Sequence, residues 1–494
     1  MMQKGIMLHT VSKAAVILSA YILHFCLGKI LSVAEYGVMG TIITLTNFYY
    51  LFLTNGVRQS ISKSISLQIY RPQMILTKNL TIQMALGILL GIANYFIAPV
   101  IANVFGNPDL KIYFEVVSVL IPLTALYFAL TGALNGMKLF WAEAIVMIIY
   151  PILRLSSIPL TYVFEGTKPL GIVWGFVTGS LVAAIFAIIF VASNIKKMKM
   201  PEQPKGLTLK HALSTSWHFI TLFAGITVIL NLDTFMLILL KGNEELTGYY
   251  TAVCNFSLVP YYLVSAVYLV ILPYVTESFK KGDYKEIAQV LSKNLFYIII
   301  GSLPIVLLIA TSSRALLANF YNARYMVAAP ALSILVFGIF MLSVFVVFTV
   351  SLNGMNQQKK STLMTMILLG VDVVLLFLLI PRYEILGAAI STTTVSVSGV
   401  IWAFFVMKEQ ISDYKIFDDK MVKAIIIILV FGIVCLLIYS LIPFNNFFIL
   451  FGSYIFVWGL LIFCLIKQKI IQLKDLTGFL SPSKTDLRDK NDRK

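Results

Sequence analysis

Long apolar segments, separated by short polar breaks, run through almost the whole chain. A membrane-spanning α-helix needs about 20 apolar residues, and these segments reach that length. Only 12% of the 494 residues are charged and 59% are hydrophobic, whereas soluble domains carry about 25% charged residues. These features predict an all-α, polytopic membrane protein. They exclude a soluble enzyme, a disordered chain and a secreted disulfide scaffold.

An outer-membrane barrel is also excluded, because its strands would read as alternating segments of about 10 residues. The apolar segments here are longer and do not alternate. Fourteen of them are predicted to be transmembrane helices. We expect these at residues 11–31, 38–57, 79–101, 112–134, 142–164, 170–192, 213–240, 248–273, 293–315, 328–352, 362–380, 386–407, 422–443 and 447–466.

Lysine and arginine residues orient the predicted bundle, because cytoplasmic loops carry an excess of both. With both termini in the cytoplasm, 29 of the 38 basic residues fall on cytoplasmic segments and six fall on external ones. The net charge of +16 is then spread over many short loops. Because this is how topology determinants are distributed, nucleic acid is not expected as a partner.

Several local patterns recur at nearly the same offset. The matches are Ala133–Met137 with Ser351–Met355, Lys78–Leu80 with Lys293–Leu295, Leu170-Gly171 with Leu386-Gly387, and Gly37 with Gly248, at offsets of 218, 215, 216 and 211 residues. The offset covers six predicted helices, an even number, so both copies keep the same orientation in the bilayer. Such a parallel repeat implies a pseudo-twofold axis along the membrane normal, with a cavity between the halves.

The repeat divides the chain into two lobes and an appendage. We expect an N-terminal six-helix lobe at residues 1–192, a cytoplasmic linker at 193–212 and a C-terminal six-helix lobe at 213–407. Two additional transmembrane helices follow at 408–466, and a cytoplasmic tail follows at 467–494. No loop is long enough to hold a catalytic domain, so the sequence predicts a transporter and not an enzyme.

Three short motifs resemble those of a known family. Leu31–Gly37 is similar to a Leu-Gly-x-x-Glu-Tyr-Gly signature, with Ser32 in place of the first glycine, and Gly56–Arg58 resembles the end of the same segment. Asn231–Phe235, followed by Leu246–Ala252, resembles an Asp-containing helix and a Gly-x-Tyr-x-x-Ala turn. The chain resembles the polysaccharide-transporter branch of the multidrug/oligosaccharidyl-lipid/polysaccharide (MOP) flippase superfamily, which includes O-antigen flippases.

This resemblance implies a protein of the bacterial cytoplasmic (inner) membrane. Its expected activity is to move undecaprenyl-diphosphate-linked oligosaccharide from the cytoplasmic to the periplasmic leaflet by alternating access, for lipopolysaccharide O-antigen or another surface polysaccharide. The expected partners are this lipid-linked oligosaccharide, the bilayer itself, and the polysaccharide polymerase with its chain-length machinery.

Four basic side chains within or next to the predicted spans are candidates for binding the diphosphate: Lys13, His24, Arg58 and Arg154. A charge at the centre of a bilayer costs about 2.5–3.5 kcal/mol on insertion scales, so each needs a reason to be there. Arg154 is the main candidate. It lies deep in its span between two prolines, and its planar guanidinium can contact a phosphate at two points. The alternatives for these residues are pairing with a carboxylate, snorkelling to the interface, or packing.

Asp233 and Asp372 are the two acids deep within predicted spans. Each could carry a coupling proton or help to hold Na⁺, and the alternative is a structural hydrogen bond or ion pair. No cofactor is expected. The four cysteines lie in apolar segments without a CxxC pair, so no metal site is expected either.

Other functions remain open. A multidrug and toxin extrusion (MATE) type cation antiporter has a related architecture, but such proteins usually stop at twelve spans and cationic drugs favour an acidic cavity. A polymerase or glycosyltransferase would carry larger external loops than this chain has. Lipid II transport is a further branch of the same superfamily.

Overall fold

The computed structural model describes residues 2–54, 58, 61, 62, 65, 71–198, 217–411, 414–441, 446–468 and 470. For a few of these, including Lys13, only the backbone is described. Residues 199–212 of the predicted linker and 471–494 of the predicted tail lie outside them. Within the described residues the chain forms helices and no strands, which confirms the predicted all-α class.

The first half of the chain forms α1 (Met2–Ile30), α2 (Val33–Thr54), α4 (Pro72–Val104), α5 (Leu110–Gly136), α6 (Phe140–Arg154), α7 (Ser157–Val163), the short 3₁₀-helix η1 (Glu165–Thr167) and α8 (Lys168–Ile195). The second half forms α10 (Trp217–Lys241), α11 (Glu244–Ser257), α12 (Val259–Lys280), α13 (Tyr284–Thr311), α14 (Ser313–Phe320), η2 (Ala323–Ala328), α15 (Ala329–Gly354), α16 (Gln358–Gln410), α17 (Asp419–Leu441) and α18 (Phe447–Lys467).

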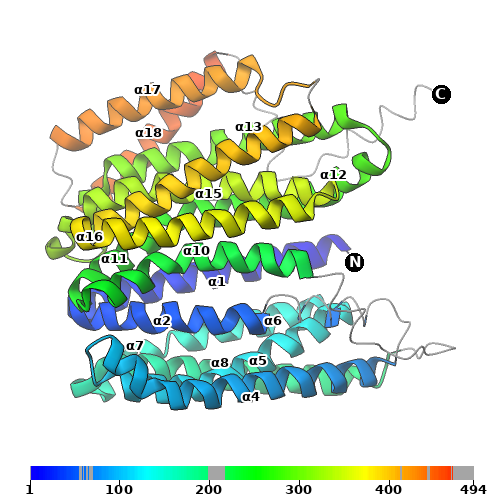
Figure 1. Ribbon diagram of the computed structural model, residues 1–494, viewed down its shortest axis with the longest axis vertical. Helices are drawn as coiled ribbons and strands as arrows, with labels where there is room; N and C mark the ends of the chain where they lie inside the picture. The colour runs from blue at the N-terminus through cyan, green and yellow to red at the C-terminus, as the bar shows by residue number, and fades with distance from the viewer. Residues whose placement is uncertain are drawn as a thin grey trace.

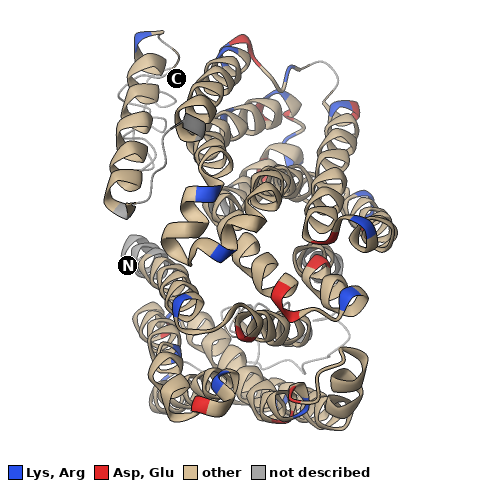
Figure 2. Cartoon of the chain, turned by 90° about the vertical axis from the view of Figure 1, so that its left-hand side faces the viewer, with Lys and Arg blue, Asp and Glu red and all other residues tan. Residues whose placement is uncertain are grey.

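The helices lie side by side as a bundle (Figure 1). Helices α1, α2 and α4–α8 form one lobe and α10–α16 form the other, and α1 and α10 lie where the two lobes meet. Helices α17 and α18 lie at the edge of the second lobe, where α17 packs on α13. Figure 2 looks along the helices from one end of the bundle.

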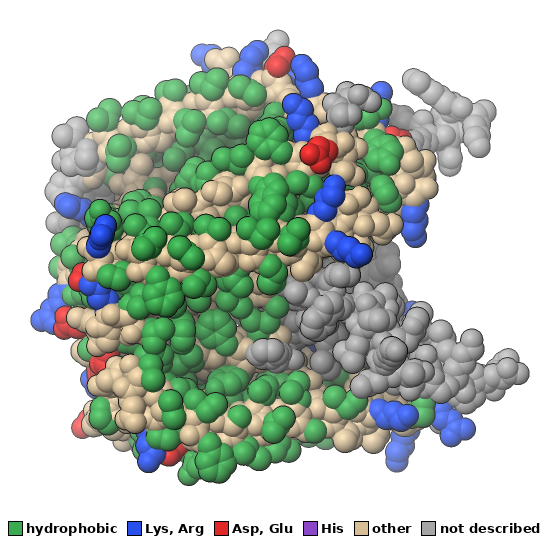
Figure 3. Space-filling view, in the orientation of Figure 1, with side chains coloured by type: hydrophobic (Ala, Val, Ile, Leu, Met, Phe, Trp, Pro, Cys, Tyr) green, Lys and Arg blue, Asp and Glu red, His purple; other side chains and the backbone are tan. Residues whose placement is uncertain are grey.

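The surface of the bundle is that of a membrane protein. Ten helices within the described residues are long and apolar enough to cross a membrane. Large apolar side chains such as Phe96, Leu378 and Phe456 are more than 60% exposed, which is stable only in contact with lipid. Hydrophobic side chains cover the middle of the bundle, and Lys and Arg gather toward its two ends (Figure 3).

The two ends differ in charge, and we name them accordingly. The basic end carries Lys138, Lys197, Lys281 and Lys415 in its loops and Lys359 in the first turn of α16. The opposite end carries Lys29, Lys111, Lys168, Lys241, Arg324 and Arg382. These residues therefore lie at the same two ends of the bundle as the fourteen-span prediction assigns to them.

Proline residues divide two of the predicted spans. The span predicted at 142–164 is broken between α6 and α7, because Pro159 has no amide to bond the carbonyl of Leu155. The span predicted at 248–273 is broken between α11 and α12, where Pro260 cannot bond the carbonyl of Phe256. The spans predicted at 362–380 and 386–407 are the two halves of α16, which bends at Glu384, a residue with φ of 50°.

Equivalent positions of the repeat adopt equivalent structures. Lys138 and Asn356 are 218 residues apart, and both have φ of 59° in the turn after the repeated Leu-Asn-Gly-Met motif. In the first lobe Asn135 donates a 2.7 Å hydrogen bond to a residue eight positions later, Glu143. In the second lobe Asn353 accepts a 2.5 Å hydrogen bond from Ser361, also eight positions later. The repeat found in the sequence is therefore a structural repeat.

Helices α2 and α11 cross at the pseudo-twofold axis. A Cβ atom on Gly37 would overlap the carbonyl oxygen of Glu244, and a Cβ atom on Gly248 would overlap that of Val33. Each residue of one pair is 211 positions from its counterpart in the other, so the contact is reciprocal, as in a symmetric dimer interface. This backbone contact joins the two lobes at the opposite end.

The Gly37→Ala variant tests this crossing. In an open helix, glycine to alanine gains about 1 kcal/mol, whereas an extra methyl group in a close contact costs about 1–3 kcal/mol. We expect Gly37→Ala to lower the melting temperature of the purified protein in detergent. Gly370→Ala is the control, since its Cβ meets nothing within 4 Å, and should leave the melting temperature unchanged or higher. Equal melting temperatures for the two variants would contradict the close crossing.

Candidate functional site

A cavity of about 250 Å³ lies between the two lobes, near the middle of the bundle. It is bounded by residues of α1, α2, α6, α10, α11 and α12. We call it the central cavity. Its polar lining residues include Tyr21, His24, Asn47, Arg154, Asn231, Thr234, Asn255 and Tyr262. The predicted cavity between the repeated halves therefore exists, and two of the four predicted cations line it.

Arg154 is the last residue of α6, immediately before the proline-dependent break. Its guanidinium carbon lies 4.1 Å from the ring centroid of Phe176 on α8, in a cation–π contact. Its Nε atom is buried without a hydrogen-bond partner among the described residues. No described carboxylate lies within 4.0 Å of it. The guanidinium thus keeps unused donors at the cavity wall.

His24 lines the same cavity from α1. Its Nδ1 atom lies 3.0 Å from the hydroxyl of Tyr36 on α2, so one ring nitrogen is used in a hydrogen bond. His24 therefore forms a structural hydrogen bond and also lies on the wall of the central cavity.

A hydrogen-bonded aromatic cluster closes the cavity toward the opposite end. The hydroxyl of Tyr36 lies 3.0 Å from that of Tyr321, and Asn255 donates to Tyr36 at 2.8 Å. Tyr21 donates to the backbone carbonyl of Asn255 at 3.0 Å. Because Tyr21 and Tyr36 belong to α1 and α2, and Asn255 and Tyr321 to the second lobe, the cluster must separate before the cavity can open at this end. The side chains of Phe25, Phe256, Phe320 and Tyr325 pack around it.

Asparagine residues cross between the lobes deeper in the bundle. Asn47 of α2 donates a 2.9 Å hydrogen bond to Asn231 of α10, and both side chains line the cavity. Asn47, Asn255 and Tyr21 are not among the site residues predicted from the sequence. An asparagine within an apolar span is a signal in the sequence that could have identified such residues, because a buried amide needs hydrogen-bond partners.

Arg58 has a different environment from Arg154. It forms a 2.5 Å ion pair with Glu143 of α6 and lies 3.7 Å from the sulfur of Met147. Glu143 also accepts the hydrogen bond from Asn135. Arg58 is absent from the described lining of the central cavity, so the structure places it in an ion pair. The side chain of Lys13 lies outside the described residues.

The two buried acids lie next to one another in the second lobe. Asp233 of α10 accepts hydrogen bonds from the hydroxyl of Tyr250 at 2.6 Å, from the amide of Thr234 at 2.7 Å and from the hydroxyl of Thr392 at 3.4 Å. Asp372 of α16 accepts a 2.8 Å hydrogen bond from Ser391. Its other oxygen, Oδ2, is buried without a partner among the described residues.

The consecutive residues Ser391 and Thr392 of α16 contact one carboxylate each. Carboxylate and hydroxyl oxygens are the ligands that hard cations prefer. Within the described residues, no group of three His, Cys, Asp or Glu side chains could hold a metal ion. Asp233 and Asp372 are therefore linked through neighbouring hydroxyl groups of α16, and we call these two residues the acid pair.

The sequence also matches a known protein family. Residues 2–279, more than half of the chain, match the family described as "Polysaccharide biosynthesis protein". The chain belongs to this family. This match confirms the resemblance to polysaccharide transporters of the MOP superfamily that the short motifs indicate.

Two curated proteins are similar over part of their length. An uncharacterized membrane protein of Methanocaldococcus jannaschii is 25% identical over 308 residues, which cover 61% of this chain and 60% of that protein. The lipid II flippase MurJ of Bacillus subtilis is 26% identical over 180 residues, 36% of this chain and 33% of that protein. The chain thus matches less than two thirds of the length of either relative.

Solved structures share the fold over nearly their whole length. A structure of lipid II flippase MurJ in an inward closed conformation has a TM-score of 0.71 and 17% identity, covering 94% of this chain and 100% of that chain. A MATE family transporter of the MOP superfamily in an inward-facing conformation has a TM-score of 0.66 and 12% identity, covering 81% and 96%. The family member described here therefore has the polytopic fold of MOP transporters.

Alanine variants of Arg58 and Arg154 test whether the paired arginine stabilises the fold more than the arginine without a described carboxylate partner. Removing one partner of a buried ion pair costs about 3–5 kcal/mol. The side chain of Arg58 is 25% exposed and that of Glu143 is 1% exposed. Because Arg58 is partly exposed, its loss should cost an amount in the lower part of that range. We expect Arg58→Ala and Glu143→Ala to lower the melting temperature in detergent, and the double variant to lose less than the sum of the two.

Arg154→Ala serves as the matched comparison for this experiment, because Arg154 has no carboxylate partner among the described residues. It should keep a melting temperature close to that of the unmodified protein. A loss as large as that of Arg58→Ala would show that Arg154 holds the fold together.

Proposed function

We propose that the protein moves undecaprenyl-diphosphate-linked oligosaccharide repeat units across the bacterial cytoplasmic membrane by alternating access, for O-antigen or another surface polysaccharide. The single observation that carries this proposal is Arg154, a guanidinium with unused donors on the wall of a cavity halfway through the bundle. Membership of the polysaccharide biosynthesis protein family supports the class of substrate.

The chemistry of the central cavity suits a diphosphate head group. A diphosphate loses much of its hydration when it enters the bilayer, and a cation in a region of low dielectric constant offsets that loss. A guanidinium contacts phosphate oxygens at two points. Arg154 would bind the diphosphate in this way, with its approach guided by the adjacent Phe176 ring.

The remaining lining offers contacts for sugars. Amides and hydroxyls such as those of Asn47, Asn231, Asn255, Tyr21 and Tyr262 can donate to and accept from sugar hydroxyls. Among the described lining residues of the central cavity there is no Asp or Glu. This composition favours an anionic glycolipid over the cationic drugs of an extruder.

Alternating access requires the cavity to reach each leaflet in turn. In this structure the aromatic cluster and the α2–α11 crossing close the opposite end. We assign the basic end to the cytoplasm, as the distribution of lysine and arginine indicates. Opening of the closed end toward the periplasm would then release the oligosaccharide after the head group has crossed.

Asp233 and Asp372 are proposed to couple this cycle to a proton or to Na⁺. The unpaired Oδ2 of Asp372 supplies the free position that an ion needs, and the hydroxyls of Ser391 and Thr392 complete the surroundings. Both acids lie on the helices α10 and α16, which pack together in the second lobe. An ion bound here would change the fit between these helices without entering the central cavity.

Substitution of Arg154 tests the substrate contact. In a strain that lacks the gene, the unmodified protein should restore surface polysaccharide, and Arg154→Ala should leave complete lipid-linked repeat units on the cytoplasmic face. Loss of a hydrogen bond to a charged group costs about 1.5–3 kcal/mol, which predicts export at least about tenfold slower. Arg154→Lys keeps the charge but not the second contact point, so it should retain part of the export.

The control for export is Arg324→Ala, an exposed cation at the opposite end. It should export normally at the same protein level. Full export by Arg154→Ala would remove this residue from the mechanism. A broad increase in drug resistance on overexpression, without any effect on lipid-linked repeat units, would favour the extruder instead.

The acid pair gives a separate prediction. If Na⁺ binds there, the purified protein should melt at a higher temperature in NaCl than in KCl of equal concentration, because a ligand at 100 times its Kd stabilises the folded state by about 2.7 kcal/mol. Asp372→Asn should abolish the difference, and Asp109→Asn, an exposed acid, should keep it. If a proton couples transport, the two salts should be equivalent and Asp372→Asn should abolish export driven by a pH gradient. An Asp372→Asn variant with neither change would contradict the coupling role.

A further inference from the structure

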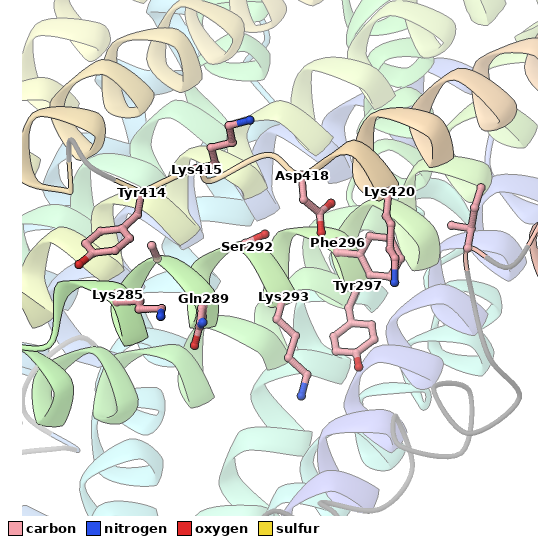
Figure 4. A pocket seen from close by; sticks show the side chains of 12 residues that line it. Lys285, Gln289, Ser292, Lys293, Phe296, Tyr297, Tyr414, Lys415, Asp418 and Lys420 are labelled. Carbon is pink, nitrogen blue, oxygen red and sulfur yellow. The ribbon is translucent and has the colours of Figure 1, made fainter.

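A second site lies at the basic end, outside the central cavity. A pocket of about 500 Å³ lies between the first half of α13 and the segment that joins α16 to α17 (Figure 4). Lys285, Gln289 and Lys293 follow one another along α13, and Asp418, just before α17, and Lys420, in the first turn of α17, project toward this helix. We call this pocket the lysine pocket.

The charge of the lysine pocket is not neutralised by its neighbours. Four lysines line it, Lys285, Lys293, Lys415 and Lys420, and no described carboxylate forms an ion pair with any of them. The one acid in its lining, Asp418, accepts a 2.8 Å hydrogen bond from the amide of Met421 at the start of α17. Glu286, the neighbour of Lys285, accepts from Ser278 of α12 at 3.0 Å. The pocket therefore attracts an anion.

An apolar groove adjoins the lysine pocket. This groove, of about 340 Å³, lies between α12, α13 and α18 and is lined by side chains that include Val264, Ile298, Ile305, Trp458, Leu461 and Leu465. Tyr297, one turn beyond Lys293, lines both the pocket and the groove. A charged compartment and an apolar one thus meet at a single side chain.

The dimensions of the combined site match one leaflet. From Lys293 to Ile305, α13 rises about 18 Å at 1.5 Å per residue, and half of the hydrocarbon core is about 15 Å thick. A ligand with a phosphate in the lysine pocket could therefore extend one chain along the groove. Neither a soluble anion nor a nucleic acid would use the apolar compartment.

We infer that the lysine pocket and the apolar groove together bind an anionic phospholipid of the leaflet at the basic end, with its phosphate among the lysines and an acyl chain beside α13 and α18. The site is distinct from the central cavity, but the two share a wall. On α12, Tyr262 lines the central cavity and the next residue, Leu263, lines the groove. A bound phospholipid would support α12 from the side that faces away from the transported head group.

The test uses the full-length protein in a neutral detergent. Phosphatidylglycerol, phosphatidylcholine and inorganic phosphate are added separately, and lipid retention is followed by native mass spectrometry together with the melting temperature. We expect phosphatidylglycerol to be retained and to raise the melting temperature, and phosphatidylcholine and inorganic phosphate to do neither. Equal effects of the two lipids, or an equal effect of inorganic phosphate, would overturn the proposal.

Charge-removing variants locate the binding. Each lysine near a membrane surface contributes roughly a factor of five to the binding of an anionic lipid, so Lys285→Gln/Lys293→Gln/Lys420→Gln should retain phosphatidylglycerol about a hundredfold more weakly. Lys359→Gln/Lys360→Gln/Lys408→Gln removes three exposed lysines at the same end but outside the pocket and should retain it normally. Equal losses in the two triple variants would show diffuse attraction and overturn the site.

Two further experiments test whether the site binds a membrane phospholipid or the lipid carrier of the proposed substrate. Gly301→Phe places a ring in the groove and should weaken phosphatidylglycerol retention while all lysines remain, and unchanged retention would contradict the acyl-chain position. Undecaprenyl phosphate is added in competition, and displacement of phosphatidylglycerol by an equimolar amount would reassign the site to the transported lipid. Because Arg154→Ala should not alter phosphatidylglycerol retention, failure of the flippase proposal would leave this result unaffected.

Discussion

A charged side chain within a hydrocarbon layer requires either a partner or water, and this requirement sorts the charges of the bundle. Arg58 has a carboxylate partner in Glu143. Asp233 has hydroxyl and amide donors. Arg154 has a phenyl ring at 4.1 Å but no described carboxylate, and it faces a cavity. The difference between a residue that stabilises the fold and one that is available to a ligand is thus visible in its immediate contacts.

The two halves of the internal repeat share their backbone features but differ in their polar and charged side chains. The positive-φ turns at Lys138 and Asn356 and the reciprocal contacts of Gly37 and Gly248 lie at equivalent positions of the two lobes. At the position equivalent to Glu143 the second lobe has Ser361. The cations of the central cavity come from the helices of the first half, and the acid pair lies in the second. The two lobes therefore share local backbone features, and each carries a different kind of site.

Much of the fold could be predicted from the sequence because lipid imposes a simple rule. Every span must be apolar and helical, so the apolar segments predicted the helices, but not the breaks between α6 and α7 and between α11 and α12. Side-chain pairing could not be predicted in the same way. Tyr36 and Tyr321 meet across 285 residues, and Arg58 and Glu143 across 85. Which helix faces which depends on the packing of the whole bundle, so the sequence could nominate Arg58 and Arg154 alike but could not show that only the first has a carboxylate partner among the described residues.

The break between α6 and α7 has a mechanical consequence for the residue that precedes it. At residues 155 and 156 the backbone amides bond to the third residue back, such as Ser156 to Leu153 at 2.9 Å. Because Pro159 has no amide, the carbonyl of Leu155 accepts from Ile158 at 3.0 Å instead. A guanidinium mounted at such a joint can shift along the bilayer normal when the joint flexes, whereas the same group in the middle of an unbroken rod would need the entire rod to slide. Arg154 can therefore change its depth in the bilayer through a local change at the break between α6 and α7.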